Sequence, residues 1–418
     1  MARTSSALRG YRRNVPLFYL VSFLRDFQVW IPVWVVFLTI DQGFSLAQVT
    51  TADGLFFVGL TVLEIPTGAV ADRCGRSRSV ALGALCFALA LAFFALTTSF
   101  PVLLLSFLTW ALAMALMSGA DLALLYDSLK ELGEEASYER HAGAGGATAW
   151  AGAAVATLIG GPLAAAYGIE LTIWIGVATA GLAALAALAM REPPRAVSSH
   201  APGLIPLIRR AIGLAWHDRV VRWVLLFSGA LSAGLGSAHY LVQPYLLANG
   251  VEVGGLFSLL QAPQLLGGAL GSLVAYRFVR RFGETAVLLG VGAAGAGAYA
   301  GVAAISSLGA FAFIPVVALL EAAVIPVATG AVNRRVPSSE RATVLSMQSF
   351  TASLVVAPLA PFVGVISDGG GPRWGFFLLG AVLAAAAGVA ALAWRPGRTS
   401  RPLFGAEAEA PAASPGAQ

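Results

Sequence analysis

The sequence predicts an all-α membrane protein with twelve transmembrane helices in two pseudo-symmetric halves of six helices each. Hydrophobic residues make up 58% of the 418 residues and charged residues 11%, whereas a soluble domain carries about 25% charged residues on its water-facing surface. The apolar residues fall into a dozen stretches of roughly 20 residues, the length at which a helix crosses about 30 Å of hydrocarbon. The connections between these stretches alternate between basic segments and segments nearly free of Lys and Arg.

The predicted spans, in chain order, are 15–40, 49–71, 79–98, 102–128, 142–166, 171–190, 221–247, 254–275, 285–305, 310–332, 342–367 and 374–394. Four arginines precede the first span, as in a signal peptide. However, the apolar stretch from Val15 to Ile40 is too long for the apolar region of a signal peptide, and no small-residue cleavage site follows it. We therefore expect it to be a membrane helix.

The distribution of basic residues predicts the orientation. Of 26 Lys and Arg, 24 fall on one side of the predicted membrane, and only Arg25 and Arg373 do not. Because basic loops stay in the cytoplasm, both termini are predicted to be cytoplasmic, in the inner (plasma) membrane of a cell. The net charge of +5 is then explained by anchoring to anionic lipid, and it does not indicate nucleic-acid binding.

A polar interruption at 191–220 divides the chain into halves. Residues 1–190 form the predicted N-terminal half and residues 221–394 the C-terminal half. The linker contains Pro193-Pro194 and an amphipathic stretch near Leu204–Trp216, and residues 395–418 read as a disordered cytoplasmic tail. Two six-helix halves joined by a linker are typical of secondary carriers, whose binding site lies between the halves.

The sequence predicts neither an enzyme nor a cofactor. No Ser/His/Asp arrangement, phosphate-binding loop or His/Cys cluster with metal-ligand spacing lies where it could act. Cys74 and Cys86 are too few for a disulfide framework, and we expect both to be reduced. The expected partners are the lipid bilayer, a small-molecule substrate and protons, with the chain as a monomer and without a metal ion.

The turn between spans two and three carries a specific pattern of glycine, acidic and basic residues, namely Gly68, Asp72, Arg73, Gly75, Arg76 and Arg78. In residue types, spacing and position this turn resembles the conserved loop of the major facilitator superfamily. The resemblance implies the two-half fold of that family and transport by alternating access. A weaker copy runs from Gly271 to Gly283 in the second half and lacks the acid.

The same resemblance implies a conformational latch. In the superfamily, the loop Asp stabilises the start of span eleven, which here is Asp72 against the segment beginning at Arg341. A carboxylate is favoured there because helix N-termini expose N–H groups and carry a partial positive charge. The family also pairs the second loop Arg with an acid at the inner end of span four, here Arg76 with Asp127. The alternative is that Asp127 only caps that end of span four.

Finer features resemble a bacterial, efflux-like branch of the superfamily. The segments concerned are Glu64–Gly68, Ser118–Asp127, Asn333–Pro337 and Arg341–Ser346. In span five, Gly161-Pro162 matches only the core of the antiporter motif of drug exporters, and the basic residue that many proton-coupled members keep in span four is missing.

Five ionisable residues lie within predicted spans, where a charge is costly and usually faces a cavity or a partner: Arg25, Asp26, Glu64, Asp121 and Glu321. Arg25 and Asp26 are adjacent, so their side chains point about 100° apart on a helix and cannot both face one direction. One possibility is that Arg25 pairs with Asp121 while Asp26 or Glu64 stays free to titrate. Burial favours the neutral form of a carboxyl group, which suits proton coupling. Asp26 is the first candidate, Glu64 the second and Glu321 the third; the alternative for each is a buried pair that only holds helices together.

Aromatic and polar residues at helical spacing predict the substrate cavity. They are Trp30 and Trp34 in span one, His239, Tyr240 and Gln243 in span seven, and Gln261 in span eight. His239 either titrates in the physiological range or packs as a hydrogen-bonded residue. Asp53 is expected at the outer edge of span two as a charge near a helix N-terminus.

These features support three functional hypotheses. The first is proton-coupled export of a small amphiphilic or drug-like molecule, an antiporter activity. The second is proton-coupled uptake of a small metabolite. The third, a membrane-embedded enzyme or receptor, would need a catalytic cluster or a large extramembrane domain, and the sequence contains neither.

Overall fold

The computed structural model describes residues 5–194, 213, 218–305, 307–336 and 341–393. Within these ranges, the side chains of residues 5–7, Ile65, Ala69, Asp72, Ala342 and Thr343 are not described. The predicted linker stretch Leu204–Trp216, apart from Gly213, and the tail 395–418 lie outside these residues. Twelve segments of the described chain are long and apolar enough to cross a membrane, as predicted, and all regular elements in it are helical.

The N-terminal bundle consists of α1 (Ser5–Asp26), η1 (Ile31–Val33), α2 (Trp34–Val36), η2 (Phe37–Asp41), α3 (Leu46–Cys74), α4 (Arg76–Ala95), α5 (Phe100–Met117), α6 (Ala120–Leu132), η3 (Glu135–Ser137), α7 (Tyr138–Tyr167) and α8 (Ile169–Leu188). The C-terminal bundle consists of α10 (Arg219–Gly236), α11 (His239–Ala248), α12 (Gly255–Phe282), α13 (Glu284–Ala304), η4 (Leu308–Ala312), α14 (Phe313–Asn333), α15 (Arg341–Gly370) and α16 (Pro372–Ala393).

Three of the predicted spans are interrupted, which the sequence did not predict. Span one breaks after Asp26, span four between α5 and α6, and span seven between α10 and α11. Pro32 lacks an N–H and disfavours helix at the residue before it, and Gly119 adopts φ +71°, so the first two breaks have local causes. Irregular backbone is tolerated inside a membrane only where protein or a water-filled cavity surrounds it.

A single glycine joins the second and third helices of each three-helix repeat. Gly75, Gly168, Gly283 and Gly371 stand between the paired helices α3/α4, α7/α8, α12/α13 and α15/α16, all with positive φ between +79° and +112°. A residue with a Cβ is strained in that conformation. This repetition reflects the pseudo-symmetry of the two halves at the level of single residues.

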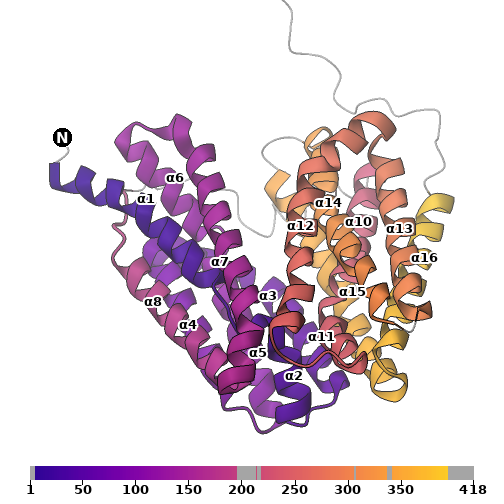
Figure 1. Cartoon of the computed structure of the whole chain (residues 1–418). Coiled ribbons are helices and arrows are strands. Elements are labelled where there is room, and N and C mark those ends of the chain that lie inside the picture. The colour runs from indigo at the N-terminus through magenta and orange to yellow at the C-terminus, as the bar shows by residue number, and fades with distance from the viewer. Residues whose placement is uncertain (1–4, 195–212, 214–217, 306, 337–340, 394–418) are drawn as a thin grey trace, which may run out of the picture.

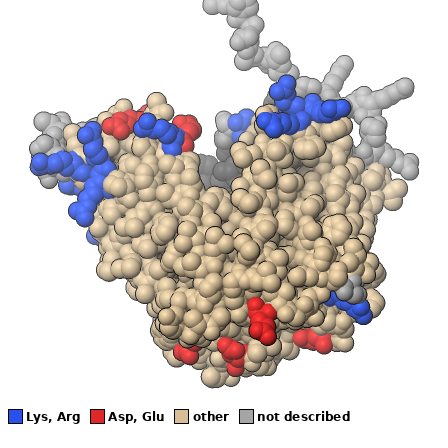
Figure 2. Space-filling view, viewed as in Figure 1, with Lys and Arg blue, Asp and Glu red and all other residues tan. Residues whose placement is uncertain are grey.

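The two bundles meet at one end and stand apart at the other (Figure 1). Lys and Arg concentrate at the upper end, which we call the basic end, and the surface is hollowed between the bundles there (Figure 2). The opposite end, which we call the closed end, is where the bundles touch, chiefly through α3 with α15 and α7 with α12. The hollow opens a central cavity toward the basic end.

Candidate functional site: the interface between the halves

The helices α3 and α15 run antiparallel and pack closely near the closed end. A Cβ added to Gly54 would lie 3.3 Å from the carbonyl oxygen of Ala357, and the hydroxyl oxygens of Thr61 and Ser353 lie 2.8 Å apart. Small residues allow such close approach between membrane helices. The contact fixes the relative position of the halves at this end.

Two glutamines of the C-terminal bundle bind the broken first span. Gln243 accepts a hydrogen bond from the Val35 N–H at 2.9 Å and donates one to the Ile31 carbonyl at 2.9 Å. Gln261 donates to the Pro32 carbonyl at 3.0 Å. The break supplies these backbone groups, since an unbroken helix would bond them internally. Gln243 and Gln261, which were predicted for the substrate cavity, are buried in the closed end in this conformation, and their contact with a substrate stays a prediction.

A cluster of titratable side chains crosses the interface beside these glutamines. The Tyr240 hydroxyl donates to Asp53 Oδ2 at 2.7 Å, and His239 Nε2 lies 3.5 Å from the same oxygen. Asp53 comes from α3 and the other two from α11. The Asp53 side chain is only 6% exposed, whereas that of His239 is 41% exposed. The cluster is therefore sealed on one side and reachable from the cavity on the other.

The contacts of His239 indicate which of its ring nitrogens carries a hydrogen. Its Nδ1 lies 2.7 Å from the Gly236 carbonyl oxygen, and because a carbonyl only accepts, Nδ1 carries a hydrogen. Nε2 therefore presents a lone pair to Asp53 when the ring is neutral and an N–H when the ring is protonated. One added proton changes this contact from repulsive to attractive.

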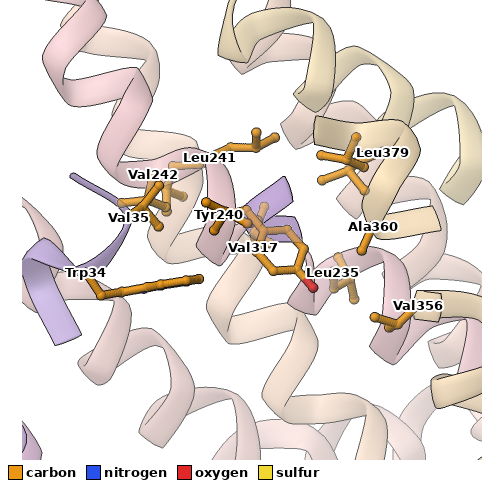
Figure 3. Close-up of a cluster of buried hydrophobic side chains, with 14 of the residues drawn as sticks. Trp34, Val35, Leu235, Tyr240, Leu241, Val242, Val317, Val356, Ala360 and Leu379 are labelled. Atoms are coloured by element: carbon orange, nitrogen blue, oxygen red, sulfur yellow. The ribbon is translucent and has the colours of Figure 1, made fainter. Parts of the chain in front are cut away.

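The aromatic residues predicted for the cavity divide between two locations. Trp34 packs against His239 across the interface, with ring centroids 6.1 Å apart. Figure 3 shows Trp34 and Val35 of the first span beside Tyr240 and Val242 of α11. Trp30 instead lies in the core of the N-terminal bundle, fully buried, where its Nε1 donates to Gln28 at 2.7 Å. Trp30 and Tyr240 are both fully buried in this conformation, and their contact with a substrate stays a prediction.

Two predicted acids have different surroundings. Glu321 of α14 is exposed although it lies mid-span, and its Oε1 would be 3.0 Å from a Cβ on Gly236, which places its carboxylate on the cavity wall near His239. Glu64 of α3 is half-buried, and no hydrogen bond or ion pair to its carboxyl is found within the described part of the chain.

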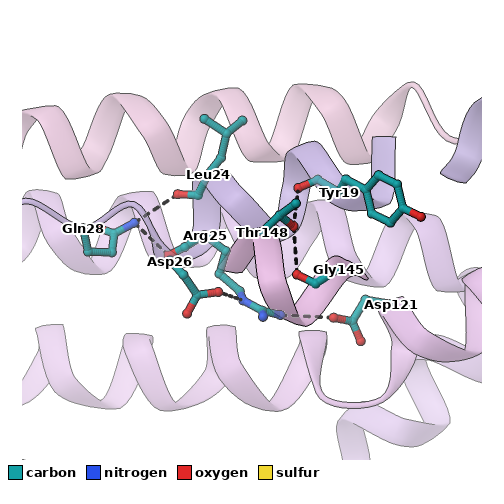
Figure 4. A network of polar contacts seen from close by, with 8 residues as sticks. All are labelled: Tyr19, Leu24, Arg25, Asp26, Gln28, Asp121, Gly145 and Thr148. Atoms are coloured by element: carbon teal, nitrogen blue, oxygen red, sulfur yellow. Dashed lines mark hydrogen bonds and ion pairs between the residues drawn. The ribbon is translucent and has the colours of Figure 1, made fainter. Parts of the chain in front are cut away.

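The predicted ion pair between Arg25 and Asp121 is present, and it is part of a larger network (Figure 4). Arg25 Nη1 lies 3.1 Å from Asp121 Oδ2, and Arg25 Nε lies 2.9 Å from Asp26 Oδ2. Of the two acids of which one was expected to stay free, Asp26 is therefore paired with the adjacent arginine, whereas Glu64 has no ion pair within the described part of the chain. Arg25 lies in the last turn of α1 and Asp121 in the first turn of α6, so both charges also suit the helix dipoles.

The predicted pairing of Arg76 and Asp127 is also present. Their side chains form an ion pair, and Arg76 Nη1 donates to the Ala123 carbonyl at 2.8 Å. Sequence reasoning missed Glu192, whose carboxylate accepts from the N–H groups of Arg76 and Ser77, both at 2.9 Å. Glu192 thus caps α4, which has only Gly75 at its N-cap position.

The remaining loop residues lie at the open, basic end. A Cβ added to Gly68 would have no atom within 4 Å, and Arg73 is exposed. The Asp72 side chain and the residues before Arg341 are outside the description, so the contact between Asp72 and span eleven stays a prediction. Gly75 adopts φ +112°, which explains the need for glycine at that position.

The interface can therefore carry a proton-sensitive contact at the closed end of a water-accessible cavity. Acids outnumber arginines among these charged residues, since Arg25 is contacted by both Asp26 and Asp121 while Glu321 lies on the opposite half. The sequence signal that could have identified Asp53 is its distance from the helix start: Ser45 already caps α3, so an acid eight residues later is not needed there.

Comparison with known proteins shows which family and which proteins the chain is similar to. The Major Facilitator Superfamily matches residues 18–320. An uncharacterized MFS-type transporter, YxaM of Bacillus subtilis (strain 168), is 30% identical over 106 residues, which cover 25% of this chain and 26% of that relative. The chain thus spans about a quarter of that relative's length in the match.

Two solved structures share the fold over nearly the whole chain. A mutant of the nucleoside transporter NupG has a TM-score of 0.81 and 14% identity, covering 91% of this chain and 100% of that one. A bacterial homologue of the human lysosomal transporter Spinster, in an inward-facing and unoccupied conformation, has a TM-score of 0.72 and 21% identity, covering 94% and 98%.

Proposed function

Because the chain belongs to the Major Facilitator Superfamily, we propose that it couples proton movement to the export of a small, positively charged amphiphile by alternating access. The basic end faces the cytoplasm, by the bias of Lys and Arg toward that side, and both termini are cytoplasmic in the plasma membrane. The conformation with an open basic end is then the inward-facing one. The protein acts as a monomer, because each chain contains both halves of the site.

One observation carries the proton coupling: His239 and Asp53 come from different halves, lie 3.5 Å apart, and only His239 is accessible from the cavity. A proton on this pair strengthens a contact that exists only while the closed end is closed. Proton binding therefore stabilises the inward-facing state, and proton release toward the cytoplasm removes that stabilisation. A ligand shifts a conformational equilibrium by its differential affinity for the two states, and here the proton is that ligand.

The pair of His239 and Asp53 replaces Asp26 as the first candidate for the coupling group. Asp26 is instead engaged within the first half, where its carboxylate lies 2.9 Å from the Arg25 side chain. Asp26 and Glu321 instead supply negative charge to the cavity from the two opposite halves. A cationic substrate fits this excess of carboxylates, and the aromatic residues near the closed end suit an apolar body.

A second candidate is proton-coupled uptake of a small metabolite. The similarity in fold to a structure named as a nucleoside transporter supports it. A proton that strengthens the contact between His239 and Asp53 would have the same effect on the conformational equilibrium in uptake. In both cases the proton moves inward. The two differ in whether the substrate moves with the proton or against it.

Reconstituted liposomes distinguish these directions. Substrates are first selected by thermal stabilisation of the purified protein, with ethidium as the cationic probe and uridine as the neutral probe. Export by antiport predicts that an acidic liposome interior drives the substrate in, whereas uptake by symport predicts that an acidic exterior does so. Transport that is equally fast without a pH gradient, in the wild type and in His239→Gln, would contradict proton coupling.

A further inference from the structure

An acid near the end of α15 binds the start of α3 in the closed end. The Asp368 Oδ1 accepts from the Leu46 N–H at 2.9 Å, and Oδ2 accepts from the Ala47 N–H at 2.9 Å. Leu46 and Ala47 are the first two residues of α3, and their N–H groups have no partner within that helix. The contact therefore joins the halves through one carboxylate and one helix N-terminus.

Neither helix needs this contact for its own stability. Ser45 and Gln48 already form a reciprocal capping box at the start of α3, with bonds of 3.1 and 3.0 Å. Asp368 lies in the last turn of α15, where the helix dipole disfavours a negative charge. Its position is explained by its partner on the other half, and water can replace it when the end opens.

Close packing one turn away shows how tightly the contact is held. A Cβ on Gly364 would lie 2.3 Å from Thr50 Oγ1 and 2.4 Å from the Ala47 Cα. Toward the basic end the bundles to which α3 and α15 belong stand apart (Figure 1). The same two helices are therefore in contact at one end and apart at the other.

The opposite ends of the pair repeat the same arrangement of residues. Asp368 stands 27 residues after Arg341, the first residue of α15, and Asp72 stands 26 residues after Leu46, the first residue of α3. In an antiparallel pair, the register that aligns Asp368 with Leu46 and Ala47 aligns Asp72 with the first turn of α15. Each helix thus carries an acid near its end that matches the other helix's start.

We propose that Asp368 is the latch of the closed end and that Asp72 and Asp368 cap each other's helices in alternation, one in each conformation. In this structure Asp368 is engaged. Opening the closed end breaks its two bonds, while closing the basic end brings Asp72 to the start of α15. The proposal rests on the alternating-access transport proposed above, but it can be tested without any substrate.

The test measures distances between spin labels in the full chain, in lipid nanodiscs, on a Cys74→Ser/Cys86→Ser background. One labelled pair, at Ile40 and Arg373, reports the closed end, and a second, at Glu139 and Arg280, reports the basic end. Asp368→Ala is expected to raise the ratio of outward-facing to inward-facing molecules by about tenfold, equivalent to ~1.4 kcal/mol. The Ile40–Arg373 distance lengthens and the Glu139–Arg280 distance shortens.

Matched variants separate the latch from general destabilisation. Glu252→Ala removes another exposed carboxylate of the C-terminal half and is expected to leave both distances unchanged. Asp368→Asn keeps one acceptor oxygen and should give a smaller shift in the same direction. Combining Asp72→Ala with Asp368→Ala should return the ratio toward that of the wild type.

Distances in Asp368→Ala and Asp368→Asn that match those of Glu252→Ala would overturn the latch. A double variant that shifts as far as Asp368→Ala alone would overturn the reciprocity. If the distances shift as expected while the wild type shows no proton-driven flux with any stabilising substrate, the latch stands and the proposed coupling fails.

Discussion

The Tyr240 hydroxyl and the Asp53 carboxylate meet across the two halves at 2.7 Å, buried at the closed end. Asp53 belongs to a helix of the first half and Tyr240 to a helix of the second, 187 positions along the chain. A buried carboxylate requires hydrogen-bond donors. This bond therefore contributes to closure, and losing it has a conformational as well as an energetic effect.

Tyr240→Phe tests that contribution. The variant keeps the ring and leaves Asp53 with one donor fewer in a buried site, which costs about 1–3 kcal/mol. We expect a lower melting temperature in detergent and a larger outward-facing population in spin-label distances. Tyr276→Phe, which alters an exposed tyrosine at the basic end, is the control, and equal melting temperatures for the two variants would refute the prediction.

The conformational equilibrium is expected to depend on pH through His239. Four groups surround or adjoin the ring: Asp53, Tyr240, Glu321 and Trp34. Adding a proton gives Nε2 a hydrogen that faces Asp53, so lowering the pH stabilises the closed end and raising it favours opening. The Ile40–Arg373 label distance, followed across the titration, reports this change.

His239→Gln should abolish that pH response, whereas His141→Gln should retain it. His141 lies beside the Tyr19 hydroxyl, away from the closed end, and serves as the matched histidine. A pH response that persists in His239→Gln and disappears in Asp53→Asn would move the titrating group to Asp53. A response that survives in both variants would exclude the pair.

Asp26→Asn is expected to weaken substrate binding without uncoupling transport. Asp121, which lies 3.1 Å from Arg25, remains as its partner in that variant, so the fold should be retained. We expect KM to rise severalfold while flux still follows the pH gradient, measured in liposomes. Loss of all gradient-driven flux in a folded Asp26→Asn protein would instead support Asp26 as the coupling acid.

Exchanging Arg76 and Asp127 is expected to restore transport only in part. Arg76→Asp leaves Asp127 facing another acid, and Asp127→Arg leaves two cations together, so each single variant should lose most activity. The double exchange restores the attraction but places the new acid beside Glu192, which binds the N–H groups at this position. Flux in the double variant no higher than in the single variants, at equal expression, would count against the latch role of this pair.

The sequence predicted those features that depend on local composition and on the cost of isolated charges. Span number follows from apolar length, and the pairing of Arg25 with Asp121 follows because a charge in hydrocarbon requires a partner. The pairing of Arg76 with Asp127 followed from a resemblance.

The sequence did not predict which end of the cavity is closed. Gln243 and Tyr240 have the polarity of cavity residues, and only the relative position of the halves decides that they are buried instead. Asp53 looked like an ordinary charge near a helix start, because its partner lies 187 positions away. Breaks in the spans depend on backbone geometry that hydropathy does not record.

Gln243 and Gln261 recognise the first span through its main-chain atoms, at Ile31, Pro32, Val35 and Val36. Side-chain identity at the recognised positions is therefore free to drift during evolution, provided that the backbone keeps its kinked path. Among homologues, we therefore expect the two glutamines and the kink of the first span to be conserved. Covariation between residue pairs across this contact should be weak. Proteins with little sequence in common could share the same mechanism of closure.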